Sequence, residues 1–136
     1  MSVRAKIRLD FKAEAGGRKF FWQRDNLSEV AKRVRSRQVS LLSNLPFQGI
    51  SVEDFNTDRD VYVLSDVENR KETAYAPLEL VVEADSVEDL MEFTLREEFR
   101  KIKILEPDHI SLSNGDLERL IFKVNEEYRD EIYFQD

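Results

Sequence analysis

The sequence predicts a single α+β domain in which a mostly antiparallel sheet carries helices on one face. Three observations predict it. Apolar and polar residues alternate strictly over residues 3–14, apolar residues recur at helical spacing in two later segments, and short strand-like runs lie between and after these segments. A chain of 136 residues is the size of one domain, so we expect residues 1–136 to fold as a unit. The predicted order of elements resembles a ferredoxin-like sandwich with an added N-terminal β-hairpin strand.

The first element is the strand over residues 3–14, with apolar residues at the odd positions and charged residues at the even ones. This period of two is typical of a strand with one buried face and one face in solvent. Gly16-Gly17 then predicts a tight turn, because glycine accepts positive φ without steric cost. Arg18–Trp22 would return as the second strand of this hairpin, with Glu14 opposite Lys19.

A helix is expected to begin at Asn26, whose side chain can cap the first turn together with Glu29. Asn44 and Pro46 predict its end. Its predicted inner stripe consists of Leu27, Val30, Ala31, Val34, Gln38 and Leu41.

The middle of the chain predicts three strands, at Ile50–Phe55, Val61–Leu64 and Ala76–Ala84, with a polar loop over Asp66–Thr73. A second helix is expected from about Asp85 or Ser86. A short strand, Lys101–Leu105, should follow it. The inner stripe of this second helix would be Val87, Leu90, Met91, Thr94 and Phe99.

The C-terminal part fits two interpretations. Asn114-Gly115 is a strong signal for a β-hairpin turn. The apolar residues from Leu117 to Tyr128 also recur at helical spacing. We favour a helix over residues 116–131, because the polar run 125–127 suits a helix surface better than a strand.

Charge is divided unevenly along the chain. Residues 1–38 carry eleven basic and four acidic residues, a net +7, whereas residues 39–136 carry ten basic and 24 acidic residues, a net −14. This division predicts a homo-oligomer or an acidic protein partner, with self-association through charged surfaces. The candidate binding residues are Arg4, Lys6, Arg8 and Lys12 on the polar face of the first strand, Phe21 beside them, and Arg33 and Arg37 on the first helix.

The alternative function is nucleic-acid binding, because cations around an exposed aromatic ring can follow a phosphate backbone and stack a base. The steep charge division is compatible with both functions, and the net charge of −7 favours the protein partner.

The sequence lacks the motifs of several kinds of enzyme, cofactor and metal site. The chain has no cysteine, one histidine (His109), no nucleophile elbow and no phosphate or dinucleotide fingerprint, so we expect no enzyme activity and no cofactor. Asp54, Asn56, Asp58 and Asp60 form a fragment of a calcium loop. Arg59 and Ser65 occupy the positions of its glycine and its bidentate glutamate, so no metal site is predicted, and whether this acidic segment binds a cation stays open.

No run approaches the roughly 20 apolar residues that a membrane-spanning helix needs. The first residues also lack the apolar stretch of a signal peptide. We therefore expect a soluble, cytoplasmic protein without membrane contact.

The segment Arg100–Pro107, RKIKILEP, resembles the end of WYL-domain transcriptional regulators, whose C-terminal extension closes with a strand, a leucine-glutamate-proline segment and a helix ending in tyrosine. The resemblance covers about residues 76–130. The tryptophan-tyrosine-leucine motif of the ligand-binding part is absent. The resemblance therefore implies a small α/β module for regulation or self-association, without catalysis or a ligand site.

Overall fold

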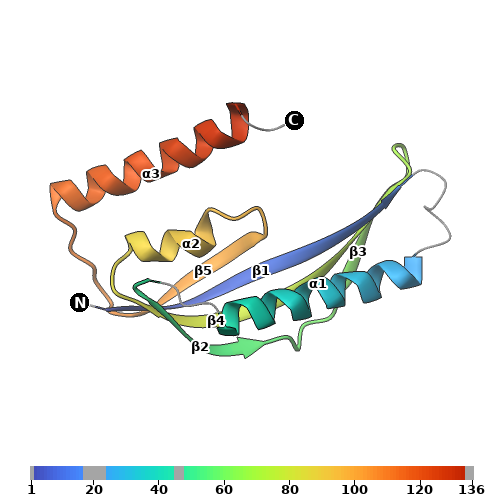
Figure 1. Ribbon diagram of the computed structural model, residues 1–136, viewed down its shortest axis with the longest axis horizontal. Helices are drawn as coiled ribbons and strands as arrows, with labels where there is room; N and C mark the ends of the chain where they lie inside the picture. The colour runs from blue at the N-terminus through green and yellow to red at the C-terminus, as the bar shows by residue number, and fades with distance from the viewer. Residues whose placement is uncertain (1, 17–23, 45–47, 134–136) are drawn as a thin grey trace.

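A computed structural model describes residues 2–16, 24–44 and 48–133 of the chain. The elements follow in the order β1 (Val3–Gly16), α1 (Arg24–Asn44), β2 (Ile50–Asn56), β3 (Tyr62–Asp66), β4 (Lys71–Ala84), η2 (Glu88–Leu90), α2 (Met91–Thr94), β5 (Phe99–Glu106) and α3 (Asn114–Tyr133) (Figure 1).

The five strands form one antiparallel sheet, in which four lie in the order β2-β4-β1-β5 and the fifth, β3, pairs with β4. β1 pairs with β4 along its whole length, from Val3 opposite Ala84 to Gly16 opposite Lys71. The other edge of β4 is shared, because β2 pairs with one end of it and β3 with the other. With α1 and α2 as crossovers, this is the strand order of a ferredoxin-like sandwich, so the predicted α+β class and antiparallel sheet are confirmed. The predicted hairpin strand Arg18–Trp22 lies outside the described residues.

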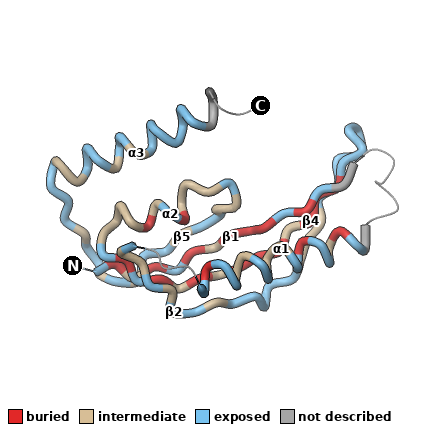
Figure 2. Tube along the Cα trace, in the orientation of Figure 1, coloured by how far each residue is buried: buried red, intermediate tan, exposed pale blue. Residues whose placement is uncertain are grey.

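The core lies on one face of the sheet. β1 contributes its odd-numbered residues and β4 its even-numbered residues, and α1 and α2 cover them from the same side (Figures 1 and 2). Leu42 of α1 and Phe93 of α2 are buried in this cluster. The period-two pattern of β1 therefore leaves its charged residues on the opposite face, which none of the described helices covers.

Helix α1 differs from the prediction in its start and its orientation. It begins at Arg24, two residues before the predicted cap at Asn26. Leu27, Ala31 and Leu42 are buried, while Val30 and Leu41 of the predicted stripe are exposed. Contact with β1 and β4 determines which residues of α1 are buried. These contacts favour a rotation of α1 about its axis that buries Leu42 and exposes Leu41.

Two predicted boundaries in the middle of the chain were wrong. β4 begins at Lys71 and not at Ala76, because residues 71–75 pair with both β1 and β3. The second helix ends at Thr94, and Phe99 begins β5. Phe99 packs against the core from a strand opposite Leu9, so its helical spacing from Leu90 was coincidental.

The C-terminal helix α3 is confirmed, and the hairpin interpretation of Asn114-Gly115 is wrong. The Ser113 Oγ accepts a hydrogen bond from the Asp116 backbone N–H at 3.0 Å, and an Asp116 carboxylate oxygen accepts one from the Ser113 N–H at 3.1 Å. This reciprocal pair is a capping box and starts a helix at that point. α3 contacts η2 near its N-terminus and lies apart from the sheet (Figure 1).

None of the helices in the described part of the chain is long and apolar enough to cross a membrane.

Candidate functional site

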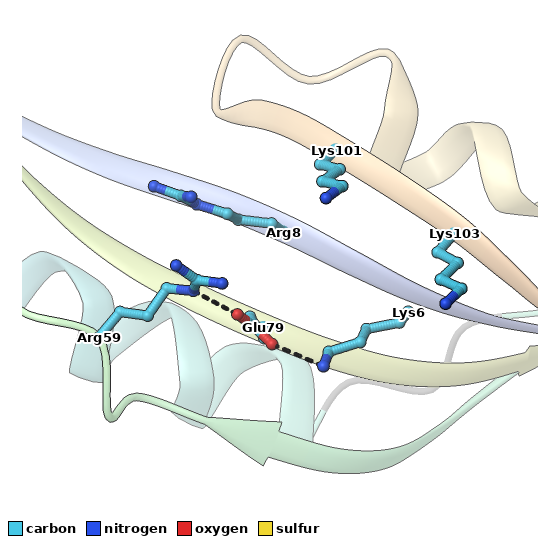
Figure 3. A pocket seen from close by; sticks show the side chains of 6 residues that line it. All are labelled: Lys6, Arg8, Arg59, Glu79, Lys101 and Lys103. Atoms are coloured by element: carbon cyan, nitrogen blue, oxygen red, sulfur yellow. Dashed lines mark hydrogen bonds and ion pairs between the residues drawn. The ribbon is translucent and has the colours of Figure 1, made fainter.

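The uncovered face of the sheet gathers cations from three parts of the chain. β1 points its even-numbered residues to this face, and the register with β5 sets Lys101 opposite Arg8 and Lys103 opposite Lys6. Arg59, between β2 and β3, reaches the same surface (Figure 3). We call this surface the open face. Its centre is a shallow cavity of about 290 Å³, lined by Lys6, Arg8, Arg59, Lys101, Lys103 and Glu79.

Glu79 is the single carboxylate among the residues that line the cavity. It accepts a hydrogen bond from Arg59 and lies 3.0 Å from the Lys6 ammonium (Figure 3). The Arg59 hydrogen bond, followed by that of Lys6, holds the pKa of Glu79 below its usual range. Glu79 is therefore ionised at neutral pH, and five cations against one carboxylate leave the cavity lining at +4.

Arg8 is held in place by a carboxylate at the margin of the cavity. Its Nε and Nη2 donate to the two carboxylate oxygens of Asp10 at 2.9 and 3.0 Å. Asp10 is buried and also accepts a hydrogen bond from the Tyr62 hydroxyl at 2.5 Å. The bond to Asp10 raises the pKa of Arg8, and burial, followed by the same carboxylate, raises the pKa of Tyr62. A two-point contact with a buried carboxylate orients the guanidinium before any partner arrives.

Lys101 and Lys103 are the cavity cations without an ion pair. Both side chains are exposed, and no carboxylate of the described residues lies within 4.0 Å of either ammonium group. Their charge is therefore available to a partner. Neither lysine was among the predicted binding residues. The signal was present, because Lys101 and Lys103 alternate with Ile102 and Ile104, but the pairing of this strand with β1 was not predicted.

The other predicted residues of β1 lie at the two ends of the open face and are already paired. Arg4 donates to Glu53 at 2.7 Å, and this hydrogen bond raises the pKa of Arg4. Lys12 donates to Glu97 at 2.5 Å, which likewise raises the pKa of Lys12. The ends of the face are therefore close to neutral, and the unpaired charge is concentrated in its centre.

The structure separates the remaining predicted residues from this face. Arg33 and Arg37 are exposed on α1, which covers the opposite face of the sheet (Figure 1). They cannot act together with the cations of β1 on a small ligand. Phe21 lies outside the described residues.

Two tyrosines at one end of the open face contact each other. The rings of Tyr62 and Tyr75 stack with centroids 5.0 Å apart and an interplanar angle of 19°. The Arg100 guanidinium lies 5.6 Å from the centroid of Tyr75. A nucleic-acid base could stack on Tyr75 only by displacing one of these contacts.

The residues considered for metal or acid–base chemistry are not brought together. In the part of the chain that the structure describes, no group of three histidine or acidic residues is placed to hold a metal ion. In the calcium-like segment, Asn56 Oδ1 accepts a hydrogen bond from the Asp58 backbone N–H at 2.8 Å, which is a local turn contact. His109 is exposed in the segment after β5.

Comparison of the chain with protein-family models, with curated proteins and with solved structures finds no match.

Proposed function

We propose that this chain is a non-catalytic protein-interaction module, acting in the cytoplasm, that binds an acidic segment of a protein partner on the open face of its sheet. The observation that carries the proposal is the pair of unpaired ammonium groups, Lys101 and Lys103, beside Arg8 and Lys6 around one cavity. Carboxylates of a partner would supply the counter-charges that the described residues do not.

Arg8 adds directional contacts to this cluster. A guanidinium has five N–H groups, and Asp10 accepts hydrogen bonds from the Nε and Nη2 atoms. The N–H groups on Nη1 remain to donate to a carboxylate oxygen. Because Asp10 already orients the side chain, little rotamer entropy is lost when a partner binds.

Three features favour an acidic protein segment over nucleic acid. The outer cations Arg4 and Lys12 are neutralised within the chain, so the unpaired charge is too short a patch to follow a phosphate backbone. The half-buried aromatic pair of Tyr62 and Tyr75 is already engaged. The net charge of −7 repels a polyanion at long range.

The acidic segment can belong to a different protein or to a second copy, whose residues 39–136 carry −14. Both sources present the same chemistry to the open face. A regulatory role without catalysis is also what the resemblance of residues 76–130 to the extension of WYL-domain regulators implies.

The test compares two double charge reversals that change the net charge equally. Lys101→Glu with Lys103→Glu reverses the centre of the open face, whereas Arg33→Glu with Arg37→Glu reverses exposed charges on α1. The probe is a fluorescent peptide of alternating Glu and Gly residues, followed by anisotropy. Exposed ion pairs contribute about 0.2–1 kcal/mol each. Losing two attractive pairs and adding two repulsive ones should therefore weaken peptide binding by the Lys101/Lys103 variant roughly tenfold or more. Peptide binding by the Arg33/Arg37 variant should stay close to that of wild type.

Equal weakening in both variants would show attraction by net charge alone and would refute the proposal. Tighter binding of a single-stranded oligonucleotide than of the peptide, lost in the Lys101/Lys103 variant, would replace the protein partner with nucleic acid. Sedimentation of the Lys101/Lys103 variant distinguishes a different protein from a second copy as the source of the acidic segment. The charge reversal would change self-association only if the partner is a second copy.

A further inference from the structure

Helix α3 carries an uncovered apolar stripe. Leu117, Ile121, Val124 and Tyr128 are 48, 61, 47 and 62% exposed, and α3 is exposed along most of its length (Figure 2). Their spacing of four, three and four residues is that of the two core positions of a coiled-coil heptad. We call these four residues the α3 seam.

The seam does not face the chain's own domain. The side of α3 that meets η2 carries Asp116, Arg119 and Leu120, and the Arg119 Nε lies 3.5 Å from Glu88. With 3.6 residues per turn, the seam lies about 110° around the helix axis from that side. The domain could cover the seam only if α3 rotated and gave up its contact with η2.

We propose that the seam is covered by the α3 of a second copy, packed antiparallel in a two-fold symmetric dimer. In this arrangement Ile121 packs against Val124 of the second copy and Leu117 against its Tyr128. A single self-complementary surface then satisfies both chains, which is the ordinary symmetry of homodimers.

The charges of α3 favour the antiparallel direction. Residues 114–123 carry two acidic and two basic residues, a net charge of zero. Residues 124–133 carry four acidic residues and one basic residue, a net −3. A parallel pair would place the two acidic halves side by side, whereas an antiparallel pair places each acidic half beside a neutral one. Each helix N-terminus would then also lie near the C-terminus of the other helix.

The exposed area of the seam is close to what a dimer needs. Large side chains expose roughly 150–250 Å² when free, so four at about half exposure present on the order of 400 Å². A standard interface buries about 800 Å² per partner, of which about 65% is apolar in homodimers, or roughly 500 Å². The seam supplies most of that area, and Leu120 at its margin adds to it.

The first experiment is sedimentation velocity of the full chain from about 1 to about 200 µM, a range that covers a micromolar dimer. Wild type should be dimeric at the upper end. Ile121→Asp should weaken the dimer by at least about a hundredfold, because symmetry buries the charge twice. Phe122→Asp is the matched control, since Phe122 is 63% exposed but lies outside the seam. It should leave the dimer intact.

The second experiment tests direction with single cysteines, which is clean because the chain has none. Leu117→Cys and Tyr128→Cys variants with different tags are mixed and oxidised. An antiparallel pair yields the mixed disulfide, because eleven residues of helix, about 16 Å, separate like positions. Disulfides between like positions would refute the antiparallel pair. A monomeric wild type at about 200 µM, or an Ile121→Asp variant as dimeric as wild type, would refute the dimer itself.

Discussion

Replacing Glu79 by Gln should strengthen binding on the open face while it weakens the fold. The carboxylate is the one negative charge lining the cavity, and its removal raises the charge of the lining from +4 to +5. For a partner carboxylate about 7 Å away in a largely aqueous medium, the lost repulsion is about 0.5–1 kcal/mol. The acidic peptide should therefore bind roughly two- to fivefold more tightly.

The cost to stability follows from the same contacts. Glu79 is 11% exposed and paired with Lys6 and Arg59, whose side chains are 50 and 57% exposed. The two cations can regain water, so the loss should be about 1 kcal/mol in the free energy of unfolding. Because the pKa of Glu79 is lowered in the folded chain, the ionised carboxylate stabilises the fold above the ordinary value of 4.5. This stabilisation is lost as the pH falls through the folded pKa. Wild type and variant should therefore differ at neutral pH and converge at an acid pH below the lowered pKa of Glu79.

Peptide anisotropy and urea unfolding at the two pH values measure both effects. Glu29→Gln is the control, because it removes the same charge from α1, where Glu29 is exposed and pairs with Lys32. Weaker peptide binding in Glu79→Gln would show that the cavity cations are not the binding groups. Equally tighter peptide binding in both variants would show that the effect comes from net charge alone.

Two further predictions concern the fold. In a thermal unfolding assay, Gly49→Ala should lower the free energy of unfolding by about 1–3 kcal/mol, because Gly49 has φ +76° and an added Cβ would meet the Asp89 carboxylate. Gly115→Ala is the control, because Gly115 lies in the open first turn of α3, and it should be neutral or slightly stabilising. A Gly49→Ala variant as stable as wild type would contradict this reasoning. Ser113→Ala removes the cap of α3 and should destabilise this helix by about 1 kcal/mol. The hydrogen bond from the Ser113 backbone N–H lowers the pKa of Asp116, so α3 should also lose helicity as the pH falls through that lowered pKa. A circular dichroism signal that does not change between neutral and acid pH would refute the capping role.

Much of the local structure could be predicted from the sequence. The alternation in β1 identifies which residues are buried and which reach solvent, because successive side chains of any strand point to opposite faces. The C-terminal helix followed from its spacing, since apolar residues three and four apart share one side of a helix. Boundaries failed where tertiary pairing extended or ended an element, as at Lys71 and Thr94.

The candidate site needed the tertiary structure. Lys101 lies far from Arg8 in the sequence, and only the pairing of β5 with β1 makes them neighbours. The same sheet places Glu79 between Lys6 and Arg59, and it places Arg33 on the far side. Strand order depends on which arrangement buries the most apolar surface over the whole chain, and no local pattern records that.

Helix α3 shows the same division. The spacing in the sequence predicts that one side of this helix carries the apolar residues Leu117, Leu120, Ile121, Val124 and Tyr128. That the described residues leave most of this stripe exposed follows from tertiary contacts, because η2 receives the neighbouring side of the helix through Arg119. Spacing along a helix is a property of the backbone geometry, whereas burial depends on which other surface the helix meets.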